Sequence, residues 1–164
     1  MKAQNERILT AYFSWGGNTR AVAEHIHKAV GGGLFEIKTA APYPKEYRPT
    51  TEAAKREQQA NARPELTGRV QDMASFDIIF LGYPNWWSSV PMALFTFLEC
   101  YDLSGKTIIP FCTHGGGGIG RSVKDIKKLC PGATVREELV IGGGSAGRAA
   151  DEVSAWLRRL GMLN

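Results

Sequence analysis

The sequence predicts an α/β fold with one doubly wound, five-stranded parallel sheet and helices on both faces. Five short apolar runs alternate with helical patterns along the chain, which is typical of strand–helix–strand units. Glycine-rich turns connect several of these runs to the segments that follow them. The length of 164 residues suits one domain with a sizeable core, so residues 1–164 are expected to form a single domain.

The first half of the chain predicts a strand, a helix and a second strand. The apolar run at 7–13 predicts a buried strand, and a helical pattern follows at 18–30. The glycines at 31–33 end this helix, because glycine readily adopts left-handed geometry. The segment at 34–38 alternates apolar and polar residues, as an edge strand does.

A long connection at 39–75 follows the second strand. Its prolines indicate a rigid loop at 42–47, in which Tyr43 and Tyr47 are candidates to shield the edge of a ligand. A polar helix is predicted at 50–62. Its mixed charges indicate a solvated face and not a surface for a partner.

The second half predicts three more strands, at 77–83, 107–113 and 134–141. The first of them contains a continuous apolar run, which is typical of a strand that is covered on both faces. The last carries three charged residues in its middle, as an edge strand does. Helices are predicted at 91–101, from 119 to 130, and near the C-terminus up to Gly161.

The apolar content of the strands predicts their order. The first, third and fourth strands are the most apolar, so right-handed crossovers give the order 2-1-3-4-5. Ligands bind such sheets at the switch point, here between strands one and three, outside the carboxyl ends. The loops after strands one, three and four should therefore meet there. The glycine turn at 142–144 lies beyond this point and is expected to be only a connection.

The loop after the first strand has the chemistry of an anion site. Its turn leaves N–H groups unpaired at a helix N-terminus, where the helix dipole favours negative charge. Gly16 and Gly17 allow close approach, and Ser14, Asn18 and Thr19 supply short polar side chains. Neither a P-loop lysine nor the dinucleotide glycine spacing is present. The alternative is an ordinary strand–helix turn with Asn18 as the helix N-cap.

The other two loops suit a planar ligand. The loop at 84–89 offers two indole planes, and the loop after the fourth strand is a glycine run that brings backbone N–H groups close to a flat polar ring. A ligand with a phosphate at one end and a ring at the other fits all three loops, and FMN is the simplest candidate. The candidate cofactor-binding residues are Ser14, Trp15, Gly16, Gly17, Asn18, Thr19, Pro84, Asn85, Trp86, Trp87, Thr113, His114, Gly115, Gly116 and Gly117.

Several of these side chains have a structural alternative. Trp86 and Trp87 could both be packing residues, but we expect one to lie against the ligand and the other against the protein. Trp15 is either a partly exposed loop residue or a lid over the ligand, and both interpretations stay open. His114 either contacts the ligand or caps the following helix.

The three loops together resemble those of the flavodoxins. The sequence S-W-G-G-N-T at 14–19 resembles the flavodoxin phosphate loop T/S-x-T-G-N-T, with Gly16 replacing the usual hydroxyl residue. The loops at 84–87 and 113–120 look like the flavin loops of single-domain flavodoxin-like proteins, and no long insertion splits 134–141. This resemblance covers nearly the whole chain and implies a short-chain flavodoxin-like fold, an FMN cofactor and a redox role.

Two functions fit this resemblance. A flavodoxin-type electron carrier needs no catalytic residue, and none is predicted. The alternative is an NAD(P)H-dependent FMN oxidoreductase that acts on quinones or similar acceptors and needs a second pocket over the ring, to which the connection at 39–75 could contribute. A response-regulator receiver is excluded, because the loops at 14–19 and 113–118 lack its carboxylates and lysine.

The charge of the sequence bears on its partners. The net charge is +4 and the pI about 9.1, but no long Lys/Arg block indicates nucleic acid. This basic balance contrasts with the acidic surface usual for electron-carrying flavodoxins. Arg121, Lys124 and Lys128, at helical spacing after a flavin loop, favour acidic redox partners, namely a donor reductase and an acceptor. A monomer or weak dimer is expected.

The cysteines and the N-terminus indicate a cytoplasmic protein. The three cysteines include no C-x-x-C pair and are interpreted as reduced thiols, and no metal site is predicted. The polar segment at 1–6 lacks the apolar core of a signal peptide. No apolar run is long enough to span a membrane.

Overall fold

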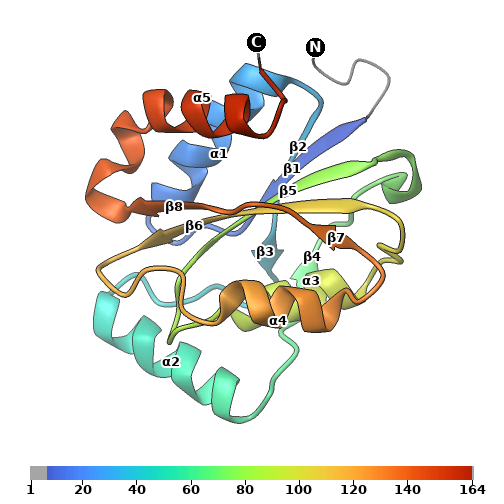
Figure 1. Cartoon of the computed structure of the whole chain (residues 1–164). Coiled ribbons are helices and arrows are strands. Elements are labelled where there is room, and N and C mark those ends of the chain that lie inside the picture. Colours follow the sequence, from blue (N-terminus) through green and yellow to red (C-terminus); the bar gives the residue numbers. More distant parts are fainter. Residues whose placement is uncertain (1–6, 164) are drawn as a thin grey trace.

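A parallel sheet forms the middle layer of the computed structural model, which describes residues 7–163 (Figure 1). The sheet order is β2-β1-β5-β6, and β7 and β8 both pair with β6, which confirms the predicted 2-1-3-4-5 order. The expectation for residues 1–6 lies outside the described residues. The strands are β1 (Ile8–Tyr12), β2 (Gly33–Glu36), β5 (Ile78–Pro84), β6 (Thr107–His114), β7 (Thr134–Val135) and β8 (Leu139–Gly142).

Helices cover both faces of the sheet, as predicted. The helices α1 (Asn18–Val30) and α5 (Ala150–Arg159) pack on one face, and α3 (Met92–Glu99) and α4 (Ser122–Leu129) on the other. Both faces of β1, β5 and β6 are buried, which explains why these strands read as continuous apolar runs. Two short 3₁₀ helices are η1 (Met73–Ser75) and η2 (Gly143–Arg148).

The last predicted strand is two strands. A three-residue break at 136–138 separates β7 from β8, so the prediction of one strand over 134–141 is wrong in this detail. The Glu137 carbonyl in the break accepts a hydrogen bond from the Trp156 indole N–H at 3.0 Å, and Arg136 N–H donates to Ile108 O at 3.0 Å. Arg136 and Glu137 are exposed and Glu138 is half-buried, while these two backbone groups stay paired.

The long connection contains more structure than predicted. It forms an antiparallel pair, β3 (Lys38–Thr39) with β4 (Leu66–Thr67), and helix α2 (Tyr47–Gln59). Strands of two residues are too short to produce a recognisable sequence pattern. Helix α2 begins before the predicted position, because Pro49 lies in its first turn, where proline is tolerated.

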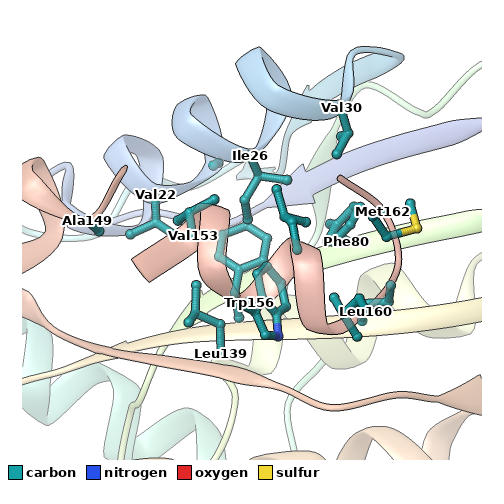
Figure 2. Packing of buried hydrophobic residues seen from close by; sticks show 14 of the residues in the cluster. Val22, Ile26, Val30, Phe80, Leu139, Ala149, Val153, Trp156, Leu160 and Met162 are labelled. Atoms are coloured by element: carbon teal, nitrogen blue, oxygen red, sulfur yellow. The ribbon is translucent and has the colours of Figure 1, made fainter. Parts of the chain in front are cut away.

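The core on the α1–α5 face is built around Trp156. This side chain is fully buried, and its ring meets Phe80 edge to face, with 5.6 Å between the centroids. Figure 2 shows Val22 and Ile26 of α1 and Val153 of α5 around it. These residues recur at helical spacing, so each helix buries one apolar stripe.

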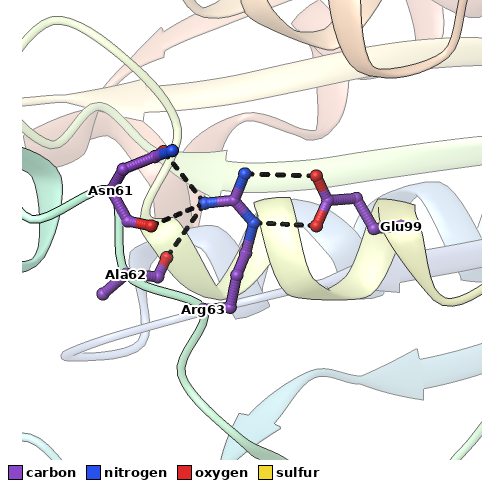
Figure 3. Close-up of polar contacts among 4 residues, drawn as sticks. All are labelled: Asn61, Ala62, Arg63 and Glu99. Carbon is purple, nitrogen blue, oxygen red and sulfur yellow. Dashed lines mark hydrogen bonds and ion pairs between the residues drawn. The ribbon is translucent and has the colours of Figure 1, made fainter.

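Arg63 fastens the end of α2 to α3 (Figure 3). Its guanidinium donates from Nε and Nη2 to the two carboxylate oxygens of Glu99, at 2.7 and 3.1 Å. Its Nη1 donates to the Asn61 and Ala62 carbonyls and to Asn61 Oδ1. This two-point geometry fixes the segment that follows α2 against the body of the protein.

Between residues 7 and 163, no helix combines the length and the hydrophobicity needed to cross a bilayer.

Candidate functional site

A cavity of about 620 Å³ opens at the carboxyl ends of β1, β5 and β6. This is the switch point at which the sequence places the ligand. Nine of its lining residues belong to the predicted loops, and six come from α2 and the start of η2. The wall comprises Trp15, Asn18, Tyr47, Thr50, Thr51, Ala54, Pro84, Asn85, Trp86, Trp87, Thr113, His114, Gly115, Gly143 and Gly144.

The loop after β1 leaves backbone donors free beside this cavity. Gly16 and Gly17 have φ of +84° and +100°, a conformation that favours glycine, and Gly17 is the N-cap of α1. Asn18 is the first helical residue, so its interpretation as the N-cap is wrong. In the part of the chain that the structure describes, no acceptor contacts the N–H groups of residues 16 to 19. Free N–H groups at a helix N-terminus favour an anion.

The hydroxyl residues of this loop are already engaged. Thr19 is buried and its Oγ1 lies 2.8 Å from Oγ1 of Thr113, which ties α1 to the end of β6. Ser14 Oγ accepts a hydrogen bond from the Arg20 N–H at 3.2 Å. Of this loop, only Trp15 and Asn18 line the cavity, whereas Ser14, Gly16, Gly17 and Thr19 do not.

Trp15 packs against the start of α2. Its indole N–H donates to Pro44 O at 2.9 Å, and its ring meets Tyr47 with 6.4 Å between the centroids. The side chain is half-buried and lines the cavity, so it is both a packing residue and part of the wall.

The loop after β5 is a tight turn that presents two indoles. Trp86 N–H and Ser89 N–H each donate to the other residue's carbonyl, and the central residues Trp87 and Ser88 have φ of +53° and +67°. Such angles in non-glycine residues cost about 1–3 kcal/mol each, so the surrounding structure must hold the turn. Ser89 does this by hydrogen bonding to the Asp125 carboxylate on α4.

The two tryptophans have different surroundings. The Trp86 ring meets Phe13 and Tyr43 edge to face, with centroid distances of 5.4 and 5.1 Å. Trp87 is 43% exposed, its indole N–H donates to Thr51 O at 2.8 Å, and the Lys55 ammonium lies 4.3 Å from its ring centroid. Trp86 therefore packs against the protein and also lines the cavity, while Trp87 lies at the mouth of the cavity.

Asn85 joins the loop after β5 to the loop after β6. Its side-chain amide donates to Gly118 O at 2.7 Å, and its backbone N–H donates to Thr113 O at 2.8 Å. His114 does not cap α4, because the N-cap of that helix is Arg121 and no side chain caps it; His114 Nδ1 instead accepts the Gly116 N–H at 2.9 Å within its own turn. Gly115 lines the cavity and Gly116 and Gly117 do not.

Two parts of the wall were missed from the sequence. Gly143 and Gly144 line the cavity, so the interpretation of 142–144 as a mere connection is wrong. A Cβ atom at Gly143 would lie 2.8 Å from Asn18 Nδ2, so this turn approaches the first loop too closely for a side chain. Helix α2 also contributes small and polar residues, and Tyr47 lines the cavity whereas Tyr43 does not.

A more open hollow of about 460 Å³ adjoins the cavity and shares Thr51 and Trp87 with it. Its remaining lining residues on α2 are mostly basic: Arg48, Lys55 and Arg56, with Glu52. We refer to the three cations as the basic rim. Arg121, Lys124 and Lys128 line neither of these two hollows, and Arg121 lies 3.4 Å from the Asp125 carboxylate.

Comparison with known proteins decides the family. The family model for flavodoxins matches residues 7–160. The chain belongs to the flavodoxin family. A candidate flavoprotein from Bacteroides eggerthii is 32% identical over 96% of this chain and 99% of that one, with a TM-score of 0.81. Curated protein sequences give no match.

Two more distant solved structures share the flavodoxin fold. A flavoprotein from Lactobacillus acidophilus, in complex with FMN, is 22% identical over 91% of this chain and 99% of that one, with a TM-score of 0.70. Two-electron reduced flavodoxin from Megasphaera elsdenii is 24% identical over 88% and 98%, with a TM-score of 0.53.

The wall of this flavodoxin-family cavity suits a molecule that carries a phosphate and a flat ring. The free N–H groups at the start of α1 suit the anionic end, and the closely approaching Gly143 narrows that end of the site. The indoles of Trp86 and Trp87 suit the ring. Cys112, which precedes Thr113 of the wall, is no candidate nucleophile, because burial raises the pKa of its thiol to about 12.

Proposed function

We propose that this flavodoxin-family protein binds FMN in the cavity and acts as an electron carrier. The observation that carries the proposal is the set of free N–H groups at residues 16–19, beside a cavity whose wall holds two indoles. FMN supplies one- and two-electron redox chemistry when bound. The protein's own residues would bind the phosphate, orient the ring and exclude water.

The geometry of the three loops supports a separate role for each. The N–H groups at the start of α1 and the Asn18 side chain would hold the phosphate. Trp86 and Trp87 would flank the ring, and the backbone at 113–115 would meet its polar edge. The FMN complex of the Lactobacillus acidophilus flavoprotein supports this choice of cofactor.

Reconstitution tests the proposal directly. The protein is incubated with excess FMN, freed of unbound flavin by gel filtration, and examined by visible spectroscopy. We expect about one flavin per chain, and a stepwise dithionite titration that is reversed by air. A protein that elutes without a flavin spectrum would refute FMN binding and every redox function built on it.

A second candidate function is that of an oxidoreductase, in which NAD(P)H reduces the bound FMN directly and the FMN then passes its electrons to a quinone. It is favoured by one observation, namely that α2 from the long connection forms part of the cavity wall. Anaerobic mixing of the reconstituted protein with NADH or NADPH discriminates between the two. Rapid bleaching without a partner reductase supports the enzyme, and persistence of the oxidised spectrum supports the carrier.

Flavin fluorescence tests the placement of the tryptophans. FMN bound beside indoles should be nearly dark, and stacking should add about 0.5–1.5 kcal/mol to binding. Because Trp86 already packs against Phe13 and Tyr43, we expect Trp87→Ala to weaken FMN binding more than Trp86→Ala. In fluorescence titrations, FMN bound to either variant should recover some of its emission. Full quenching and unchanged affinity in both variants would contradict this placement.

The basic rim is proposed to receive an acidic redox partner. Its three cations lie beside the mouth of the cavity, where a partner must approach the flavin. We expect Arg48→Gln/Lys55→Gln/Arg56→Gln to slow electron transfer with an acidic ferredoxin about 10-fold at low ionic strength, because steering by charge accelerates association. Stopped-flow rates at low and high salt measure this.

The chain offers a matched control for the basic rim. The variant Lys124→Gln/Lys127→Gln/Lys128→Gln removes the same charge from α4, and these three residues line neither of the two hollows. It should slow the reaction much less. Equal slowing by both triple variants would mean that net charge alone acts, and would refute a localised docking site.

We also propose a cytoplasmic location. The support for it is that Cys100, Cys112 and Cys130 are free thiols, as is usual in a reducing compartment.

A further inference from the structure

Three side chains form a continuous chain from the cavity wall to helix α2. Trp86 lines the cavity, and the Tyr43 ring meets it edge to face with 5.1 Å between the centroids. The Tyr43 hydroxyl donates to Glu57 Oε1 at 2.6 Å. Phe13 packs against both rings, at 5.4 Å from Trp86 and 5.9 Å from Tyr43, so the pair is held in place.

The surroundings prevent Tyr43 from ionising alone. Burial, and then the hydrogen bond and charge of Glu57, raise the pKa of Tyr43 far above its ordinary value. Burial also raises the pKa of Glu57, against the hydrogen bond from Tyr43 and the charge of Arg56. An electron can therefore leave Tyr43 readily only if its proton leaves too, and Glu57 is placed to take it.

We propose that Trp86, Tyr43 and Glu57 form a proton-coupled electron relay, which returns an electron to Trp86 after this residue has been oxidised. The relay rests on the proposed FMN function, because its oxidant is a flavin excited by blue light. Trp86 loses one electron to that flavin and becomes a cation radical. Tyr43 then gives one electron to Trp86 and its hydroxyl proton to the Glu57 carboxylate. The products are neutral Trp86, a neutral Tyr43 radical and protonated Glu57, so charge and atoms balance.

The relay would move oxidising equivalents away from the cofactor. Without it, the Trp86 radical remains beside the flavin that accepted its electron, and the pair recombines at once. With the relay, the radical lies on Tyr43, which does not line the cavity and whose hydroxyl proton has moved to Glu57. The reverse steps restore all three residues when the electron returns. Exposure to light then leaves the binding site chemically unchanged.

Transient absorption of the FMN-loaded protein tests the relay at pH 8, well above the ordinary pKa of a carboxyl group. After a blue flash we expect a long-lived tyrosyl radical in the wild type. Tyr43→Phe and Glu57→Gln should each lower its yield at least five-fold, leaving a short-lived tryptophan radical. Trp86→Phe should lower it to a similar degree.

Tyr101→Phe is the matched control. Tyr101 also packs edge to face against an aromatic ring, that of Phe97 with 5.1 Å between the centroids, but it does not line the cavity. Its hydroxyl accepts the Val70 N–H at 2.9 Å, and no carboxylate is hydrogen-bonded to it in the described structure. Its replacement should leave the radical yield unchanged. An undiminished tyrosyl radical in Tyr43→Phe, in protein that retains FMN, overturns the relay alone. Failure of the wild type to retain FMN overturns the proposed function and removes the relay's oxidant with it.

Folding of the variants is checked independently. Circular dichroism and FMN retention should match the wild type for Tyr43→Phe, which loses one oxygen atom. Should Glu57→Gln retain no FMN, Tyr43→Phe by itself decides the outcome, because it breaks the same hydrogen bond and keeps the aromatic packing.

Discussion

Riboflavin should bind this protein at least about 100-fold more weakly than FMN, although the two ligands share the same ring. The N–H groups at residues 16–19 have no acceptor in the described structure, and the α1 N-terminus favours negative charge. Each hydrogen bond to a charged group is worth about 1.5–3 kcal/mol. Loss of only two would weaken binding by about 3 kcal/mol, which is about a 100-fold change in affinity. Fluorescence or calorimetric titrations of the apoprotein measure both constants.

Asn18→Ala separates the phosphate end of the site from the ring end. Asn18 lines the cavity, and its side chain has no partner among the described hydrogen bonds. Its removal should lower FMN affinity about 10-fold through one charged hydrogen bond and leave riboflavin affinity unchanged. Thr19→Val should instead act on stability, because the Thr19 hydroxyl is paired with Thr113 inside the protein. Equal affinities for FMN and riboflavin would refute the phosphate role of this loop.

The sequence was sufficient where periodicity and turn chemistry agreed. Helix α1 begins at Asn18 and ends at Val30, as predicted, because an apolar stripe and glycines at both ends mark its limits. The sheet order followed from the apolar content of the strands, and the switch point followed from that order. The loops after β1, β5 and β6 therefore converge as expected.

The sequence was not sufficient where tertiary contacts determine the role of a residue. A threonine in a phosphate loop suggests a ligand contact, yet the partner of Thr19 is Thr113, 94 positions away along the chain. The sequence of the glycines at 142–144 does not indicate whether they merely connect two elements or line the cavity. Their role in the cavity wall is recognised only from the close approach of Gly143 to Asn18. In the break of the last strand, the Glu137 carbonyl likewise bonds to Trp156, 19 positions away along the chain.

Helix α2 shows a further limit. Its polar, charged sequence indicates a solvated helix, and most of its surface is exposed. Yet Thr50 and Ala54 on the same helix are buried, and one edge of the helix lines the cavity. Small residues spaced four apart were the available signal, but they are too common in solvated helices to indicate a binding wall.

Replacing Trp156 by alanine should destabilise the protein by about 3–5 kcal/mol. This side chain is fully buried between α1, α5 and the sheet, and its removal leaves a cavity in a close-packed core. Its indole N–H also satisfies the Glu137 carbonyl in the break between β7 and β8. Urea denaturation of the apoprotein, followed by circular dichroism, gives the free energy of unfolding for each variant.

Two further variants separate packing from hydrogen bonding. Trp156→Phe keeps most of the apolar volume but leaves the Glu137 carbonyl without its donor, so we expect a loss of about 1–3 kcal/mol. Trp87→Phe also removes an indole N–H, but at a half-exposed position, and should change stability by no more than about 0.5 kcal/mol. Because β8 leads from the break directly into Gly143, the Trp156 variants should also weaken FMN binding. A loss of stability below about 1 kcal/mol in Trp156→Ala would contradict the central role given to this side chain.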